Sequence, residues 1–243
     1  MRAYIDPDLQ QAVQRGLIGW YIATGRDLPW RRTTDPYAIL VSEILLQQTQ
    51  VATVLPVYEA FLARWPTFAA LAAAPLAAVK AVTDPLGYHI RGEWLHRIAT
   101  IVTADLGGQL PDTLPGLLAL PGIGRYTAGA ILSFAFQQDA PIVDTNVDRL
   151  LGRLFNLHAG RPPAALREKR LWALAAALIP PGHGYLFNQA LMDFGAQVCT
   201  PYKPVCLFCP LRPHCQWWTP RPDGGVTYGE DPAGAPGRWP PGG

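Results

Sequence analysis

Residues 120–131 read Leu-Pro-Gly-Ile-Gly-Arg-Tyr-Thr-Ala-Gly-Ala-Ile, a tight turn followed by a helical pattern. The Gly122-Ile123-Gly124 triplet predicts a tight turn, and the apolar run after it predicts a helix over 127–136. Glycines at such a place let the backbone approach a phosphate, with the first amides and the helix dipole directed at it. A G-x-G pair is also common in ordinary turns, so this pattern alone leaves both interpretations open.

Helical signals also dominate the rest of the chain, and strand signals are scarce. Asp35-Pro36 has the form of an N-cap followed by proline in the first turn. We expect helices over about 36–49, 76–82, 145–155, where Thr145 could supply the cap, and 166–178. From residue 219 to 243 more than half of the residues are Gly or Pro, which predicts a tail rather than a further domain. The body is therefore expected to be all-α and to end near residue 218.

Composition describes a packed globular protein. The chain has 243 residues, of which 49% are hydrophobic and 16% charged, with a net charge of +2. This weak positive charge permits nucleic-acid binding without arguing for it, because a local patch matters more than the total. No signal-peptide pattern begins the chain and no run of about 20 apolar residues occurs. We expect a protein that is cytoplasmic, has no contact with a membrane and is a monomer.

The four cysteines, Cys199, Cys206, Cys209 and Cys215, lie close together with the spacing C-x6-C-x2-C-x5-C. Without export signals, four thiols at such spacing favour a metal centre over disulfides. Zinc usually takes two close C-x2-C pairs, and only one such pair occurs here. From spacing alone, iron–sulfur is favoured, and zinc and disulfides remain open.

Two acidic residues stand in positions suited to chemistry. Glu43 is flanked by apolar residues over 39–46, and burial would make its carboxyl a proton donor near neutral pH. Asp144 follows the apolar run 141–143 and precedes a predicted helix. The simpler interpretations are a salt bridge to an arginine for Glu43 and an N-cap for Asp144.

The hairpin and the cysteine loop resemble those of the iron–sulfur helix-hairpin-helix DNA glycosylases, the endonuclease III-like superfamily. Further segments resemble its adenine DNA glycosylase (MutY) branch and occur in the same order: 27–31, 42–51, 86–88, 141–147 and 187–193. The resemblance implies two all-α lobes with double-stranded DNA bound in the cleft between them. One lobe would span 30–138 and hold the hairpin; the other would combine 1–29 with 139–218 and carry a [4Fe–4S] cluster on the four cysteines.

The resemblance also implies roles for single residues. Glu43 would be the general acid, Asp144 would stabilise the cation-like sugar, and Asn146 would support the acid network. Gln48 and Tyr88 would wedge into the base stack. Thr49, next to Gln48, would also bind DNA. The phosphate-binding candidates in the hairpin are Gly122, Gly124 and Thr127. Strand-cutting relatives carry a lysine where this chain has Tyr126, so the resemblance implies base release without efficient strand cleavage. Tyr126 would instead bond Asp144 or the sugar and help to hold the cation-like state; the simpler interpretation is a core aromatic at the start of a helix.

Some residues depart from the adenine branch. His89 stands where the branch often has a second tyrosine, and Thr83-Asp84-Pro85 replaces its usual Trp-x-Gly. The segments 28–40 and 191–194 also resemble short thymine glycosylases that act on T·G mismatches, whereas 46–49 follows the adenine branch. We therefore expect adenine removal opposite 8-oxoguanine or guanine. Thymine or uracil removal opposite guanine is the alternative within the class, and a non-catalytic iron–sulfur DNA-binding module is the alternative outside it.

Overall fold

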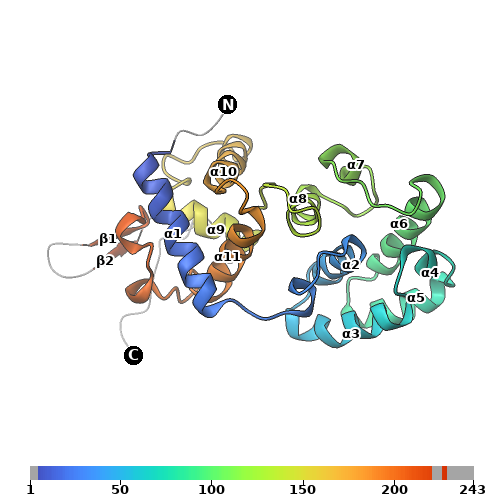
Figure 1. Ribbon diagram of the computed structural model, residues 1–243. Coiled ribbons are helices and arrows are strands. Elements are labelled where there is room, and N and C mark those ends of the chain that lie inside the picture. Colours follow the sequence, from blue (N-terminus) through green and yellow to red (C-terminus); the bar gives the residue numbers. More distant parts are fainter. Residues whose placement is uncertain (1–4, 221–225, 229–243) are drawn as a thin grey trace. The chain divides into compact units, whose positions relative to one another are not determined.

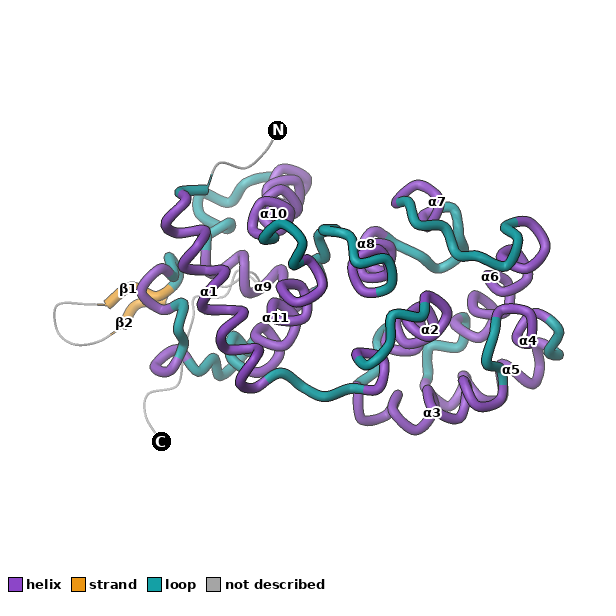
Figure 2. The backbone as a smooth tube through the Cα atoms, in the orientation of Figure 1, coloured by secondary structure: helices purple, strands orange, loops and turns teal. Residues whose placement is uncertain are grey.

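The computed structural model describes residues 5–220 and 226–228, which are helical apart from two short strands and the loops (Figures 1 and 2). The chain forms two compact units, and each is described by itself. Unit 1 combines Met1–Arg26 with Pro141–Gly243, and unit 2 is the continuous segment Asp27–Ala140. The expected all-α class is confirmed. No helix in the described part is long and apolar enough to cross a membrane.

Unit 2 is built around α2 (Pro36–Leu46), which is buried over nearly its whole length. Asp35 caps this helix, because its side chain accepts a hydrogen bond from the Tyr37 amide at 3.0 Å, and Pro36 occupies the first turn as expected. Helices α3, α6 and α8 pack against α2. The other helices of the unit are α3 (Val51–Arg64), α4 (Phe68–Ala72), α5 (Leu76–Thr83), α6 (Arg91–Asp105), α7 (Leu114–Leu118) and α8 (Arg125–Phe134).

Unit 1 joins the two ends of the chain. Helix α1 (Pro7–Thr24) packs on α11 (Gly184–Gln197), which in turn packs on α9 (Thr145–Leu154), and α10 (Ala164–Leu178) completes the core. The apolar side chains that these helices share include Leu17, Leu151, Leu171 and Phe194, all 2% exposed or less. Burying this apolar surface is what stabilises a unit whose parts lie far apart in the sequence.

The cysteine segment follows α11 and has little regular structure. It contains two short 3-10 turns, Cys206–Phe208 and Arg212–His214, and ends in strand β1 (Trp218–Pro220). Strand β1 pairs antiparallel with β2 (Val226–Tyr228), with Thr219 opposite Thr227. The sequence did not predict this hairpin inside the Gly/Pro-rich tail; the rest of the tail, 221–225 and 229–243, lies outside the described residues.

The predicted helices exist, but several of their ends differ from the predictions, and α10 begins at Ala164 rather than at 166. Helix α2 ends at Leu46 rather than near Thr49, because Gln48 takes a left-handed φ of 55° that cannot continue a helix. Helix α8 begins at Arg125, two residues earlier than predicted, and ends at Phe134. Asp144, not Thr145, caps α9.

Candidate active site and cysteine centre

Glu43 lies in the middle of α2 and is 5% exposed. Its burial follows from the helix itself, since residues 37–45 are all buried and leave no polar face toward water. The sequence-based expectation of a buried glutamate is therefore met in the structure, while its role as the acid stays a prediction.

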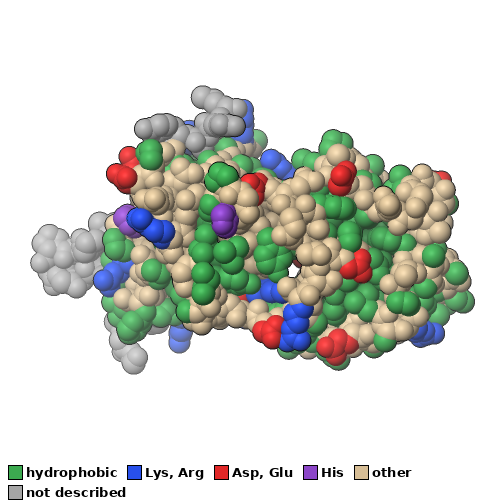
Figure 3. Space-filling model, viewed as in Figure 1, with side chains coloured by type: hydrophobic (Ala, Val, Ile, Leu, Met, Phe, Trp, Pro, Cys, Tyr) green, Lys and Arg blue, Asp and Glu red, His purple; other side chains and the backbone are tan. Residues whose placement is uncertain are grey.

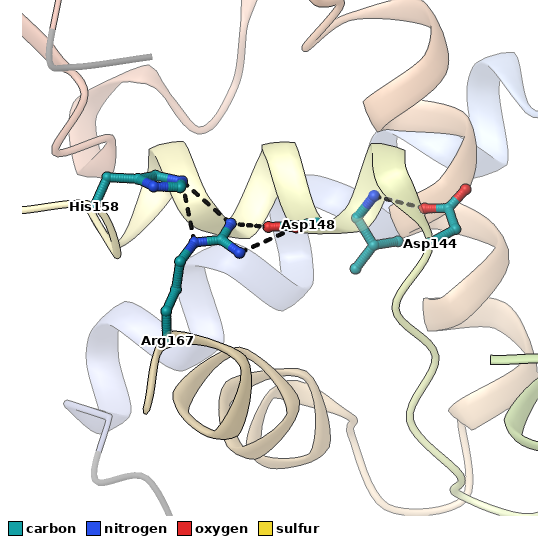
Figure 4. A network of polar contacts seen from close by, with 5 residues as sticks. Asp144, Asp148, His158 and Arg167 are labelled. Atoms are coloured by element: carbon teal, nitrogen blue, oxygen red, sulfur yellow. Dashed lines mark hydrogen bonds and ion pairs between the residues drawn. The ribbon is translucent and has the colours of Figure 1, made fainter. Parts of the chain in front are cut away.

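Asp144 stands at the N-terminus of α9, where the helix dipole favours a negative charge (Figure 4). Its Oδ1 accepts a hydrogen bond from the Val147 amide at 2.7 Å, and its Oδ2 accepts one from Asn146 Nδ2 at 3.0 Å. The cap is therefore present and Asn146 bonds the carboxylate, while the role of Asn146 in the reaction stays a prediction. The two bonds fix the direction in which the carboxylate points.

A chain of hydrogen bonds continues from this carboxylate to the cysteine segment. Arg149 Nη2 donates to Asn146 Oδ1 at 2.8 Å and to the Gly195 carbonyl at 2.7 Å, while its Nε donates to the Cys199 carbonyl at 2.7 Å. Helices α9 and α11 can come this close only because residue 195 is a glycine: a Cβ there would lie 2.8 Å from the Asn146 carbonyl oxygen. Arg149 could not be identified from the sequence, because no local pattern indicates that an arginine will bind carbonyl groups about fifty residues further along the chain.

A second polar network holds the other side of α9 (Figure 4). Arg167 on α10 forms an ion pair with Asp148, and its Nε donates to His158 Nε2 at 3.3 Å. These contacts connect α9, the loop after it and α10. The network fixes the helix that carries Asp144, and it could not be predicted from local sequence patterns.

The hairpin has the backbone that its glycines predict. Gly122 has a φ of 73°, and a Cβ there would lie 2.3 Å from the ring of Trp94. Both the backbone conformation and the lack of space therefore require glycine at this position. Gly124 is the N-cap residue of α8, and no atom of the protein lies within 4 Å of a Cβ built there. Thr127 is only 3% exposed, so little of this residue could meet a phosphate at the surface. Tyr126 lies in the first turn of α8 and is half-buried.

The predicted wedge residues lie on two neighbouring turns of unit 2. Gln48 occupies the turn between α2 and α3, and Thr49 Oγ1 accepts a hydrogen bond from Arg91 Nη2 at 2.7 Å. Tyr88 lies on the turn before α6, with its ring edge against Trp94 at a centroid distance of 5.6 Å. Arg91 and Trp94, which the sequence analysis did not single out, are the side chains that these turns share.

The four cysteines line a single cavity in unit 1 together with apolar side chains and two arginines. None of the four forms a disulfide. Burial is the main cause that raises the pKa of Cys206 to about 12, and the neighbouring cysteines add to it. Burial is also the main cause that raises the pKa of Cys209 to about 11. Burial also raises the pKa of Cys215. Thiols that resist ionisation in one apolar cavity need a positive centre before they can be thiolates together.

Arg153 ties the cysteine segment to α9. It is buried, donates to the carbonyls of Thr200 and Pro201 at 2.8 and 3.0 Å, and lies 4.4 Å from the ring centroid of Trp217. Its Nη1 is also 3.6 Å from Cys199 Sγ.

Within the described residues, no three His, Cys, Asp or Glu side chains converge closely enough to hold one metal ion.

Positive charge is not concentrated on one visible surface. On the face drawn in Figure 3, Lys and Arg side chains lie at separate positions among hydrophobic and neutral groups. This agrees with the small net charge of +2. On this face, a phosphate backbone would therefore meet single cations rather than a basic patch.

Comparison with known proteins places the chain in a family. Residues 41–176 match the HhH-GPD superfamily of base excision DNA repair proteins. The chain is 44% identical over 214 residues to the adenine DNA glycosylase of Homo sapiens, covering 84% of this chain and 39% of the relative. It is also 44% identical over 203 residues to that of Mycolicibacterium smegmatis, covering 83% of this chain and 68% of the relative.

The solved structure of a thermostable thymine-DNA glycosylase is similar along almost its whole length. Its TM-score is 0.80 at 33% sequence identity, and the match covers 86% of this chain and 96% of that one. The chain thus spans about two-fifths of the human relative and nearly all of the thymine-DNA glycosylase. The matched family, the sequence identities and the shared fold show that this chain belongs to the HhH-GPD superfamily of base excision DNA repair proteins.

Proposed function

We propose that the protein is a DNA glycosylase that hydrolyses the N-glycosidic bond of adenine mispaired with 8-oxoguanine or guanine. The observation that carries the proposal is the burial of Glu43 within the apolar helix α2, in a chain 44% identical to adenine DNA glycosylases over 84% of its length. A non-catalytic binding module would have no need of a carboxyl group buried within an apolar helix.

The chemistry assigns one task to each carboxyl group. Adenine leaves readily only after a proton is added to its imidazole ring, and a neutral Glu43 donates that proton. The sugar becomes cation-like as the bond breaks, and an ionised Asp144 stabilises the positive charge. Water then adds to the sugar, so that free adenine and an abasic site are the products. Asn146 keeps the Asp144 carboxylate in its orientation through the bond to Oδ2.

The reaction stops at base removal. Cleavage of the strand by a lyase route begins when an amine attacks the sugar and forms an imine. The hairpin presents Tyr126 at the position where strand-cutting relatives carry lysine, and a phenol cannot form an imine. Tyr126 instead contributes to holding the sugar, as the sequence analysis expected.

The hairpin holds the DNA backbone, which positions the enzyme without reading sequence. The protein itself leaves open space around Gly124. A glycine there is explained if a phosphate takes that space and accepts hydrogen bonds from the first amides of α8. The target base must leave the stack to reach the carboxyl groups, and Gln48 and Tyr88 fill the gap that it leaves.

The four cysteines hold a [4Fe–4S] cluster. The donor set fits, because each iron of such a cluster takes one thiolate and the four thiols line one cavity. The cluster would supply the positive centre that these buried thiols need and would order a segment with almost no helix or strand of its own. Cys199, Cys206, Cys209 and Cys215 would be its ligands. We expect the protein to act on double-stranded DNA as a cytoplasmic monomer.

One experiment tests the proposal directly. The protein is incubated in excess with duplexes that contain A·8-oxoguanine, A·G, T·G or U·G, and the released base is identified by mass spectrometry. We expect adenine from the first two duplexes and no strand break before alkali treatment. Release of thymine or uracil instead would contradict adenine specificity, and release of no base would contradict the whole class.

The thymine alternative has an observation in its favour. The thermostable thymine-DNA glycosylase matches this chain over 96% of its own length, which no adenine relative reported above does. Sequence identity weighs against it, at 33% compared with 44% for the adenine glycosylases. The T·G and U·G duplexes of the same assay separate the two activities.

A further inference from the structure

One buried arginine connects the turns that carry the two wedge residues. Arg91, at the start of α6, is 0% exposed. Its guanidinium donates to the Leu45 carbonyl at 2.9 Å and the Gln47 carbonyl at 2.6 Å. A third bond reaches Thr49 Oγ1 at 2.7 Å. The three acceptors lie on alternate positions at the end of α2 and in the segment after it, with Gln48 between the last two.

That segment needs an external partner. The last carbonyls of a helix find no N–H donor within the helix, and burying them without another donor would be costly. Gln48 also has a φ of 55°, a conformation that side-chain-bearing residues rarely adopt unless their surroundings impose it. The bonds from Arg91 to both neighbours of Gln48 are the contacts that impose it here.

The same arginine contacts the second wedge. Its guanidinium carbon lies 5.6 Å from the centroid of the Tyr88 ring, and Tyr88 meets Trp94 edge to face. Trp94 lies directly against Gly122 of the hairpin, and Gln47 Nε2 donates to the Gly122 carbonyl at 3.2 Å. The two wedge turns and the hairpin therefore form one connected assembly within unit 2.

We propose that Arg91 is the positioning residue that holds Gln48 and Tyr88 in the geometry needed to fill the gap left by an extruded base. The inference rests on the proposed DNA glycosylase function and deepens it. Preorganisation matters because side chains that must be ordered during extrusion add their own cost to the unstacking of the base. Lysine cannot replace arginine here, since a single ammonium does not have the planar fork that reaches three acceptors in fixed directions.

The test measures extrusion separately from chemistry. The duplex carries an A·G mismatch whose adenosine has a 2′-fluorine, which blocks bond cleavage, and a 2-aminopurine next to it that fluoresces when unstacked. Wild-type protein is compared with Arg91→Met and Arg91→Lys at saturating concentration. Arg97→Met is the matched control, because Arg97 is an exposed arginine on the same helix. Thermal unfolding measures how much of each variant is folded.

We expect the fluorescence increase per bound protein to fall about tenfold or more in both Arg91 variants and to stay at the wild-type level in Arg97→Met. Affinity for a fully paired duplex, which depends on the phosphate contacts, should change by less than about threefold. Arg91→Lys keeps a buried cation, so it decides the question if Arg91→Met does not fold. Wild-type fluorescence in a folded Arg91 variant would overturn the inference.

Failure of the proposed function has a different outcome. A wild-type protein that unstacks the mismatch but releases no adenine from a cleavable duplex contradicts the adenine glycosylase, while the role of Arg91 is still measured by fluorescence. A wild-type protein that binds the mismatch without any fluorescence increase contradicts the positioning role itself.

Discussion

Replacing Gly195 by alanine tests whether the close approach of α9 and α11 sets the geometry of Asp144. The added Cβ would lie 2.8 Å from the Asn146 carbonyl oxygen, 2.9 Å from its Cβ and 3.0 Å from its carbonyl carbon. None of these atoms is the end of a flexible side chain, so the two helices must move apart. Asn146 is also the residue whose amide holds Asp144 Oδ2.

The magnitude follows from two opposing effects. Overpacking a buried contact costs about 1–3 kcal/mol, and contact with main-chain atoms places this site near the upper value. Alanine in place of glycine inside a helix recovers about 1 kcal/mol. The free energy of unfolding should therefore fall by about 2 kcal/mol, which corresponds to a decrease of about 4–8 °C in Tm for a domain of this size.

Gly19→Ala is the matched control. Gly19 is an exposed glycine inside α1, with no atom within 4 Å of the added Cβ. The same substitution there should raise the free energy of unfolding by about 0.5–1 kcal/mol and leave base release unchanged. In Gly195→Ala, by contrast, the single-turnover rate should fall by about tenfold or more, because the Asp144 carboxylate loses its orientation. A Gly195→Ala protein as stable and as active as Gly19→Ala would refute the reasoning.

Other outcomes follow from the same site. Glu43→Gln should leave less than about a tenth of the single-turnover rate with DNA binding nearly intact, since it removes a transition-state interaction rather than a binding one; a residual rate above that would rule out the general-acid role. Asp144→Asn should also lose base release yet keep its Tm within about 2 °C, because asparagine is as good an N-cap as aspartate; a large drop in Tm would mean that the charge serves stability instead. The purified protein should be brown and contain about four irons, and Cys206→Ser should lower the iron content; one zinc and no iron after anaerobic purification would exclude the cluster. Borohydride should trap no covalent protein–DNA adduct at the rate of base release, because Tyr126 cannot form an imine; an adduct formed at that rate would reveal an attacking amine.

Local patterns allowed much of the fold to be predicted from the sequence. Asp35-Pro36 predicted the start of α2, and the Gly122-Ile123-Gly124 turn with the apolar run after it predicted α8, because capping and left-handed turns depend on a few adjacent residues. The end of α2 was misjudged because Gln48 adopts a positive φ that only distant contacts explain. Helix α3 likewise continues past Pro56, which a local criterion would treat as a break.

The candidate site divides in the same way. Glu43 and Asp144 could be found from flanking residues, and the structure adds their burial and their bonds. Arg91 and Arg149 could not be found, since Arg91 lies 46 residues from its partner Leu45 and Arg149 lies 50 residues from Cys199. An arginine that is buried looks the same in the sequence as one in water. Only the folded chain distinguishes them.

The way unit 1 is assembled from both ends of the chain has a consequence for synthesis on the ribosome. Helix α1 is translated before unit 2, but its partner α11 is translated only after all of unit 2 has been completed. Unit 2, a continuous segment, can fold while the chain is still growing, whereas α1 must wait with its apolar side chains exposed to chaperones or to other nascent chains. The four cysteines follow α11, so a cluster held by them, as proposed above, could be inserted only after unit 2 has been translated.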